Sequence, residues 1–466
     1  MDGVIRSNLT TSPTTHCSPD IASGGANTVL VTLLLAAVSL PIWAMRPLDF
    51  VKFGDIKYQL VMGIALTAGL ALLVEAVAVG GFRLRASPSL WALGVLVIDG
   101  LAASLASEDP TVAVTGNLIR RDGYLMLLGN AMLFLIAYSV SAGRVRCVAR
   151  MLATAVVLAA LPVWAYAFAQ SLGADPFVWE PFRGESGRVF STLGNPIFLG
   201  AYSMMASLVA LGLWMDRGRR LRRWWLAAAA LGVGVTGLTA SRAAWLGLAL
   251  GCLALCWPAL RARALTRLVV GAVAAAVLGV SLVGLLAWVG TPAQRTMLTQ
   301  SVQTLSDPGA GRNAGRVAIW NITLEMIRDH PYLGVGPDLM GARFEEYRTA
   351  GYDAAEGEDR IADKPHSVVL EWGVETGIPG AVLFSGLVLG VLYLGAGVAT
   401  AASQEAAERW ALAGIWAAAV AYMGQSLITV TAIGVDGVWW VLLGTLSGAF
   451  VALAPRNPAP SHGGKT

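Results

Sequence analysis

Residues 311–338 read GRNAGRVAIWNITLEMIRDHPYLGVGPD, and residues 363–380 read DKPHSVVLEWGVETGIPG. Both lie in the interval 290–380, the only long part of the chain that uninterrupted apolar runs do not dominate. This interval is dense in Arg, Asp, Glu and His, whereas the sequence on either side of it is mostly apolar. We therefore expect membrane helices around one polar interval, with chemistry or recognition located in that interval.

The composition of the 466 residues supports a membrane protein, since 56% are hydrophobic and only 13% are charged. Soluble domains contain roughly 25% charged residues. Apolar runs of about 20 residues recur, the length that a helix needs to cross the hydrocarbon core. Because lipid offers no hydrogen-bond partners to the backbone, such runs must be helical. The predicted fold class is an all-α polytopic membrane protein.

Hydropathy predicts about twelve transmembrane helices. They cover residues 27–44, 58–79, 90–105, 124–140, 151–171, 196–215, 224–238, 244–260, 268–289, 378–399, 410–428 and 438–454. This divides the chain into an N-terminal tail (1–26), helices one to nine (27–289), a large, partly helical loop with re-entry to the membrane (290–377), helices ten to twelve (378–454) and a C-terminal tail (455–466).

Basic clusters orient these helices. FRLR (82–85), GRVRCVAR (143–150), DRGRRLRR (216–223) and RARALTR (261–267) follow alternate helices and so lie on one side. Because basic residues are more frequent on the cytoplasmic side, both tails are predicted to be cytoplasmic. The N-terminal tail is also predicted to be disordered. The loop 290–377 then lies outside.

Several arginines oppose this charge bias at the outer side: Arg120, Arg121, Arg183, Arg188 and Arg242. Topology gives no reason for them, and guanidinium groups suit a phosphate or carboxylate ligand. An anionic ligand at the outer face is one interpretation. The other is binding of lipid headgroups, or pairing with nearby acids such as Asp122 and Glu185.

The outer loop is predicted to have structure of its own. Residues 315–329 show helical periodicity, with an apolar stripe made of Val317, Trp320, Ile322, Leu324 and Ile327. Residues 338–349 are predicted to form a second helix, and 351–359 a flexible acidic tip. Both helices are too polar to span, so they would lie over the membrane surface.

Three residues are the best candidates for catalysis. His366 stands at the outer entrance to a membrane helix, and histidine exchanges protons near neutral pH; the alternative is a capping or interfacial histidine. Arg242 is flanked by apolar helix, where an unpartnered charge is costly. Arg316 opens the loop helix, whose free N–H groups favour an anion. Together these groups would fit a pyrophosphate and stabilise it as it departs.

Metal chemistry has little support in the sequence. It contains no DxD, HExxH or CxxC motif and no phosphate-binding loop of the Walker type. The acidic residues Asp353, Glu356, Glu358 and Asp359 are better explained as a solvated loop than as ligands of a hard cation. We predict no metal, no cofactor and no nucleic-acid partner.

Four blocks together resemble the O-antigen ligase and polymerase family of bacterial envelope enzymes. They are RVFSTLGNPIFLGAY (188–202), TASRAAWLG (239–247), GRVAIW with HPYLGVGPD (315–338), and PHSVVLEWGVETGIPG (365–380). Their order and spacing agree with the family from about residue 120 onward, and RRDG (120–123) resembles a block in one branch. One departure is His-Ser at 366–367, where many relatives have His-Asn; this bears on the acceptor subtype.

The resemblance implies a fold related to the GT-C glycosyltransferases, located in the bacterial inner membrane with its active site facing the periplasm. Such enzymes move a glycan from an undecaprenyl-diphosphate carrier to the hydroxyl of a lipid or glycan acceptor, without metal and with inversion. The family's essential arginines map onto Arg242 and Arg316 and its histidine onto His366. The further residues expected to bind the diphosphate are Arg188, Arg120, Arg121 and Arg312.

Within the family, a ligase is preferred over a polymerase or a protein O-oligosaccharyltransferase. From a different class, a polysaccharide or lipid transporter would place polar residues near mid-bilayer and often shows inverted repeats. Here the polar residues gather at one face and no repeat is visible. A non-catalytic scaffold would not need Arg242 at membrane depth.

Overall fold

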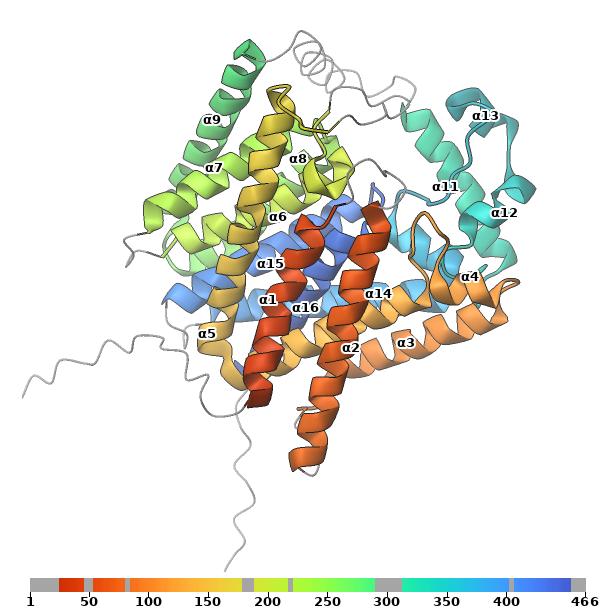
Figure 1. Ribbon diagram of the computed structural model, residues 1–466, viewed down its shortest axis with the longest axis horizontal. Coiled ribbons are helices and arrows are strands. Elements are labelled where there is room, and N and C mark those ends of the chain that lie inside the picture. Colours follow the sequence, from red (N-terminus) through yellow and green to blue (C-terminus); the bar gives the residue numbers. More distant parts are fainter. Residues whose placement is uncertain are drawn as a thin grey trace, which may run out of the picture.

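The computed structural model describes residues 25–45, 53–79, 84–177, 188–216, 221–289, 312–401 and 406–453. Throughout these ranges the regular structure is helical (Figure 1). The predicted tails, except for residues 25 and 26, and the start of the outer loop up to residue 311 lie outside the described residues, as do parts of two of the basic clusters.

Each of the twelve predicted spans coincides with a helix. In chain order the elements are α1 (Gly25–Trp43), α2 (Phe53–Val79), α3 (Pro88–Ala106), α4 (Pro110–Thr115), α5 (Tyr124–Ser171), η3 (Ser191–Leu193), α6 (Pro196–Trp214), α7 (Arg222–Leu238), α8 (Arg242–Arg261), α9 (Leu265–Val289), α11 (Arg312–Asp329), α12 (Met340–Tyr347), α13 (Ala350–Glu356), α14 (Val368–Thr400), α15 (Ala406–Ser426) and α16 (Ile433–Leu453). The fourth and fifth predicted spans both fall within α5.

Nine helical segments of the described chain are long and apolar enough to cross a membrane. They are Phe53–Ala78, Pro88–Ala106, Tyr124–Gly143, Val148–Ser171, Pro196–Trp214, Arg242–Arg261, Leu265–Leu285, Val368–Thr400 and Ile433–Leu453. Thr28–Trp43 is a shorter apolar helix. The chain is therefore a polytopic all-α membrane protein, as its apolar runs predicted.

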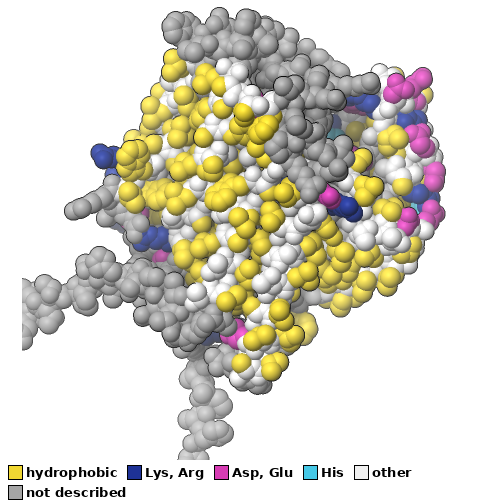
Figure 2. Space-filling view, viewed as in Figure 1, with side chains coloured by type: hydrophobic (Ala, Val, Ile, Leu, Met, Phe, Trp, Pro, Cys, Tyr) yellow, Lys and Arg dark blue, Asp and Glu magenta, His cyan; other side chains and the backbone are white. Residues whose placement is uncertain are grey.

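Helices α6 and α16 lie at the centre of the bundle and α9 at its edge. In the most apolar 18-residue stretch of each helix, 89% of α6 and 78% of α16 is buried inside the protein, but only 22% of α9. Small residues allow close approach in the centre, since a Cβ at Gly444 would meet the Phe134 carbonyl oxygen of α5 at 2.2 Å. Apolar side chains cover most of the bundle face in Figure 2, as expected of helices in contact with lipid.

Helices α11, α12 and α13 pack with α4 around a second, smaller core at one end of the molecule (Figure 1). Acidic and basic side chains gather over this end in Figure 2. The large apolar residues of α11 that are buried in this core are Ile319, Ile322 and Met326, which follow the helical spacing of three and four. The predicted stripe is thus partly wrong: Ile322 is fully buried, but Val317 and Leu324 are about half exposed because they lie on the opposite face.

The predicted acidic tip 351–359 is folded in its first part, where α13 forms. Arg348 explains this, because its guanidinium group bonds the carboxylates of Glu345 and Asp353. It also donates to the carbonyl oxygens of Glu358 and Arg360. The prediction of flexibility is wrong here, since one arginine links both ends of the segment.

A break in α14 joins the polar end to the membrane helices. Gly377 has φ 76°, and the helix resumes at Ile378, where the tenth span was predicted to begin. The amide of Ile378 donates to the Pro331 carbonyl (2.9 Å), and that of Val335 donates to the Val374 carbonyl (2.8 Å). A Cβ at Gly377 would lie 2.5 Å from the Tyr332 backbone, so only glycine fits. The HPYLGVG segment is thereby held against the first turns of α14.

Candidate active site

A cavity of about 780 Å³ opens where α8, α11 and the start of α14 meet. Four predicted site residues line it: Arg188, Arg242, Arg316 and His366. They come from four separate chain segments that span 179 positions of sequence. The tertiary structure thus brings the three proposed catalytic residues and one proposed diphosphate ligand to one place.

Arg242 is the first residue of α8 and faces this cavity together with its neighbours 240–243. Ser241 caps the helix, since its side-chain oxygen accepts a hydrogen bond from the Ala244 amide (3.4 Å). The helix therefore begins at the cavity wall, and its positive end points to the same space as the guanidinium group. Helix N-termini of this kind favour anions.

Arg188 and Arg316 approach from other elements. Nε of Arg188 donates to the Thr239 carbonyl oxygen (2.8 Å), which holds the guanidinium group at the end of α7. Arg316 lies one turn inside α11, which begins at Arg312, so the expectation that Arg316 opens the helix is off by one turn. One turn further on, Nε1 of Trp320 donates to the Pro365 carbonyl (2.9 Å) and ties α11 to the residue before His366.

His366 adopts a left-handed backbone conformation with φ 56°. Such conformations are uncommon outside glycine, and strain of this kind gathers at functional sites. Ser367, which follows it, is the extended N-cap residue of α14. Nδ1 of His366 is buried and has no hydrogen-bond partner among the described residues. The imidazole therefore lines the cavity with one ring nitrogen that no described residue hydrogen-bonds.

Burial lowers the pKa of His366, and the positive charge of Arg316 lowers it further. Asp363 acts in the opposite direction, but the net shift is downward. Because the ordinary value is about 6.5, the imidazole is neutral at pH 7. A neutral imidazole can accept a proton, which is what a general base requires.

The cavity carries an excess of positive charge. Its lining contains four arginines, counting Arg360, and two carboxylates, Glu356 and Asp363. Both carboxylates are paired: Glu356 with Arg360 (2.9 Å) and Asp363 with Arg120 (2.6 Å). The lining therefore holds more arginines than carboxylates, which suits an anionic ligand.

Two of the remaining predicted arginines, Arg120 and Arg121, do not line this cavity. Arg120 makes a bidentate ion pair with Asp363 through Nε (2.6 Å) and Nη2 (3.0 Å). Nε of Arg121 bonds Asp55 on α2 (2.8 Å). The structure therefore gives no support to diphosphate binding by Arg120 and Arg121, because neither lines the cavity and each is paired with an acidic side chain. The side chain of Arg312 lies outside the described residues.

Lys364 lies next to the site without lining its cavity, and it was not among the predicted residues. Its side chain is 2% exposed, and Nζ bonds Asp122 (2.5 Å) and Glu371, with Glu375 at 3.8 Å. Burial acts to lower the pKa of Lys364, but these carboxylates hold it well above its ordinary value. The sequence did hold a signal for it: Glu371 and Glu375 lie four positions apart on an apolar helix, where such charges require a partner of opposite charge.

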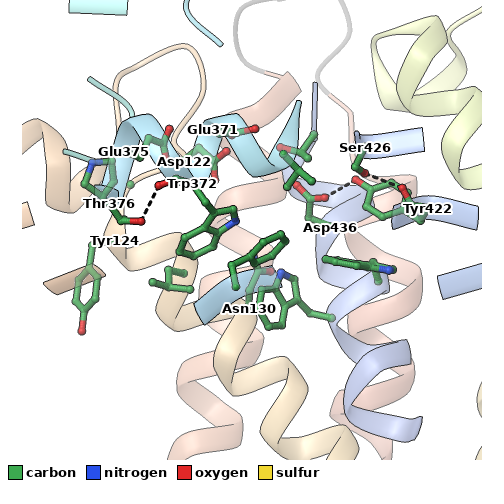
Figure 3. Close-up of a pocket in the computed structure, with 18 residues that line it drawn as sticks. Asp122, Tyr124, Asn130, Glu371, Trp372, Glu375, Thr376, Tyr422, Ser426 and Asp436 are labelled. Carbon is green, nitrogen blue, oxygen red and sulfur yellow. Dashed lines mark hydrogen bonds between the residues drawn. The ribbon is translucent and has the colours of Figure 1, made fainter. Parts of the chain in front are cut away.

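These carboxylates border a small cavity of about 70 Å³ (Figure 3). Trp372 stacks on Phe384 across it, with ring centroids 4.8 Å apart. On the far wall the Tyr422 hydroxyl donates to Asp436. Lys364 thus anchors the segment that precedes His366 to the membrane helices.

We expect Lys364→Met to lower the stability of the folded protein by about 3–5 kcal/mol, because it leaves buried carboxylates without their cation. The midpoint of thermal unfolding in detergent would measure this. Arg360→Met is the control, since that cation is 60% exposed and belongs to a surface pair. Equal melting temperatures for the two variants would contradict the role given to Lys364.

Residues 227–385 match the family model described as O-antigen ligase. The match runs from α7 to the resumed part of α14, and it contains Arg242, Arg316 and His366. A search of curated proteins found no match. The family supports a membrane glycosyltransferase activity of the ligase or polymerase type. The chain thus carries a domain of the O-antigen ligase family, which confirms the family recognised in its motifs.

Proposed function

We propose that the protein transfers a glycan from an undecaprenyl-diphosphate carrier to an acceptor hydroxyl, as O-antigen ligases do. The observation that carries this is the convergence of Arg188, Arg242, Arg316 and His366 on one cavity. A cationic pocket with one neutral imidazole matches the two needs of the reaction. These needs are to bind a diphosphate leaving group and to remove a proton from the attacking hydroxyl.

The arginines act on the leaving group. As the bond between the sugar's anomeric carbon and the phosphate oxygen breaks, its electron pair and the negative charge move onto the diphosphate. Guanidinium groups bind such oxygens in pairs. Donors already positioned where the charge develops stabilise the transition state without reorganising. Arg242 and Arg316 fill this role, and Arg188 assists them.

His366 acts on the acceptor. A sugar hydroxyl is too weak an acid to ionise beforehand, so its proton moves to the imidazole while the oxygen bonds to the anomeric carbon. The acceptor attacks opposite to the departing diphosphate, and the configuration at that carbon inverts. His366 later releases the proton to solvent. Neither a metal nor a nucleoside triphosphate takes part in this scheme.

The reaction takes place on the periplasmic side of the bacterial inner membrane. The support is the distribution of basic clusters, which assigns the loop 290–377 to the outer side. In this arrangement α11, α12 and α13 cover the site, and the polyprenyl chain lies against the apolar bundle. Residues 290–377 then act as a periplasmic catalytic loop.

Reconstitution tests this function. The purified protein in liposomes receives undecaprenyl-diphosphate glycan and one acceptor at a time: lipid A–core, a second lipid-linked repeat, or a protein with Ser and Thr. We expect one acceptor class, lipid A–core, to gain glycan while free undecaprenyl diphosphate appears in equal amount. EDTA should not change the rate, because arginines neutralise the diphosphate.

The outcome also separates the competing functions. Glycan transfer to a lipid-linked repeat would identify a polymerase, and transfer to Ser or Thr a protein O-oligosaccharyltransferase. Movement of intact glycolipid across the bilayer without release of undecaprenyl diphosphate would identify a transporter and contradict the proposal. A strong loss of rate with EDTA would contradict the metal-independent mechanism.

A further inference from the structure

Two motifs that the arginine-lined cavity does not use meet in a second cavity of about 400 Å³. The RRDG segment contributes Arg120 and Asp122, and the GNP segment contributes Asn195 and Phe198. The other walls are the start of α2, with Phe53 and Lys57, and the segment 431–435 before and at the start of α16. Neither the family match nor the proposed mechanism explains why these segments converge.

We propose that this second cavity binds the acceptor, taking the sugar that carries the attacking hydroxyl. The inference rests on the proposed function, because an acceptor site has meaning only beside a donor site. The ligand class is a neutral, hydroxylated sugar ring at the end of a larger acceptor. The position, the charge and the shape of the cavity each support this assignment.

The two cavities lie on either side of one ion pair. Arg120 lines the second cavity, and its partner Asp363 lines the first. Asp363 lies three residues before His366, and the charges of both partners act on the imidazole. The connection between α15 and α16 is also shared: Thr429 lines the first cavity and Thr431 the second. A sugar in the second cavity would therefore lie close to the proposed base and to the donor.

The charges in the second cavity are already compensated. Arg120 is paired with Asp363, and Asp122 with Lys364. Nζ of Lys57 donates to the carbonyls of Pro41 (2.7 Å) and Ala44 (2.6 Å) at the end of α1, where the helix dipole is negative. This cavity therefore does not offer the excess positive charge that a second diphosphate would need. It fits a neutral ligand better than an anionic one.

The shape and chemistry of the walls suit a sugar. Phe53 and Phe198 supply apolar surface, while Asn195 and Asp122 supply polar groups. Sugar rings present an apolar face and a hydroxylated edge, and pockets of about 300–1,000 Å³ hold small ligands. Gly194 shapes this wall: it has φ 74°, and a Cβ there would lie 2.8 Å from the Phe53 ring. The glycine thus lets the GNP turn pack against Phe53.

Filling the cavity tests the proposal. Ala432 lines it and is only partly buried, so Ala432→Phe adds a ring to the space at little cost to the core. We expect the KM for the acceptor to rise on the order of 10–200-fold. The dissociation constant for undecaprenyl diphosphate, measured by direct binding, should stay unchanged. Phe198→Ala removes another part of the cavity wall and should also raise the KM for the acceptor without changing donor binding.

The matched control is Ala276→Phe, which adds the same ring to an exposed position on α9 that lines neither cavity. It should leave both constants unchanged. An unaltered acceptor KM in folded Ala432→Phe and Phe198→Ala would overturn the acceptor site, as would loss of donor binding alone. If instead the wild-type protein releases no undecaprenyl diphosphate with any acceptor, the proposed function itself has failed.

Discussion

Replacing His366 by alanine should lower the rate of glycan transfer by about 10²–10⁴-fold, the usual contribution of a general base. Binding of undecaprenyl diphosphate should persist, because Arg188, Arg242 and Arg316 remain in the cavity. The measurement is initial transfer rate in liposomes at saturating donor and acceptor, paired with direct binding of undecaprenyl diphosphate. If His366 is the catalytic base, His366→Ala should lose transfer rate but keep its affinity for undecaprenyl diphosphate.

The left-handed backbone at position 366 requires a second variant. Alanine is disfavoured at φ 56°, whereas asparagine tolerates this conformation but cannot act as a base. His366→Asn should therefore be as inactive as His366→Ala while melting like the wild-type protein. His330→Ala is the control, because His330 lines none of the three cavities described above. Near-normal transfer by folded His366→Asn would show that this side chain is not the base.

Replacing Arg316 by glutamine should lower the transfer rate by about 10²–10³-fold, as removal of one donor to a developing negative charge does. It should also weaken undecaprenyl diphosphate binding, unlike the histidine variants. Arg328→Gln is the matched control, since Arg328 is exposed on the same helix and lines none of these cavities. If the two variants have equal rates, Arg316 does not bind the leaving group.

The same variant should change the pH dependence of transfer. A base must be deprotonated, so activity falls as the pH drops through the pKa of His366. Burial and Arg316 lower this pKa, so the wild-type enzyme should keep its activity down to a pH below about 6.5. Without the positive charge of Arg316 the pKa rises, and the acid limb of kcat/KM should move to higher pH. A purely structural role for Arg316 would leave that limb in place.

Much of the fold followed from hydropathy, because a helix in lipid must satisfy its own backbone and cover its length with apolar side chains. The tenth predicted span begins at Ile378, where α14 resumes after the non-helical Gly377, but the break itself was not predicted. The polar end was harder to predict. Arg348 folds the acidic segment of α13 through four partners near in sequence, and composition alone describes such a segment as flexible.

The sequence by itself determined the membrane helices, the one polar interval, and the candidates Arg242, Arg316 and His366. Ionisable residues are rare and costly among apolar helices, so those that remain stand out. Only the tertiary structure decided which of them meet. The pairing of Arg120 with Asp363 spans 243 positions, and that of Lys364 with Asp122 spans 242. The local sequence pattern does not predict such contacts, because they depend on how segments that are distant in the chain pack against one another.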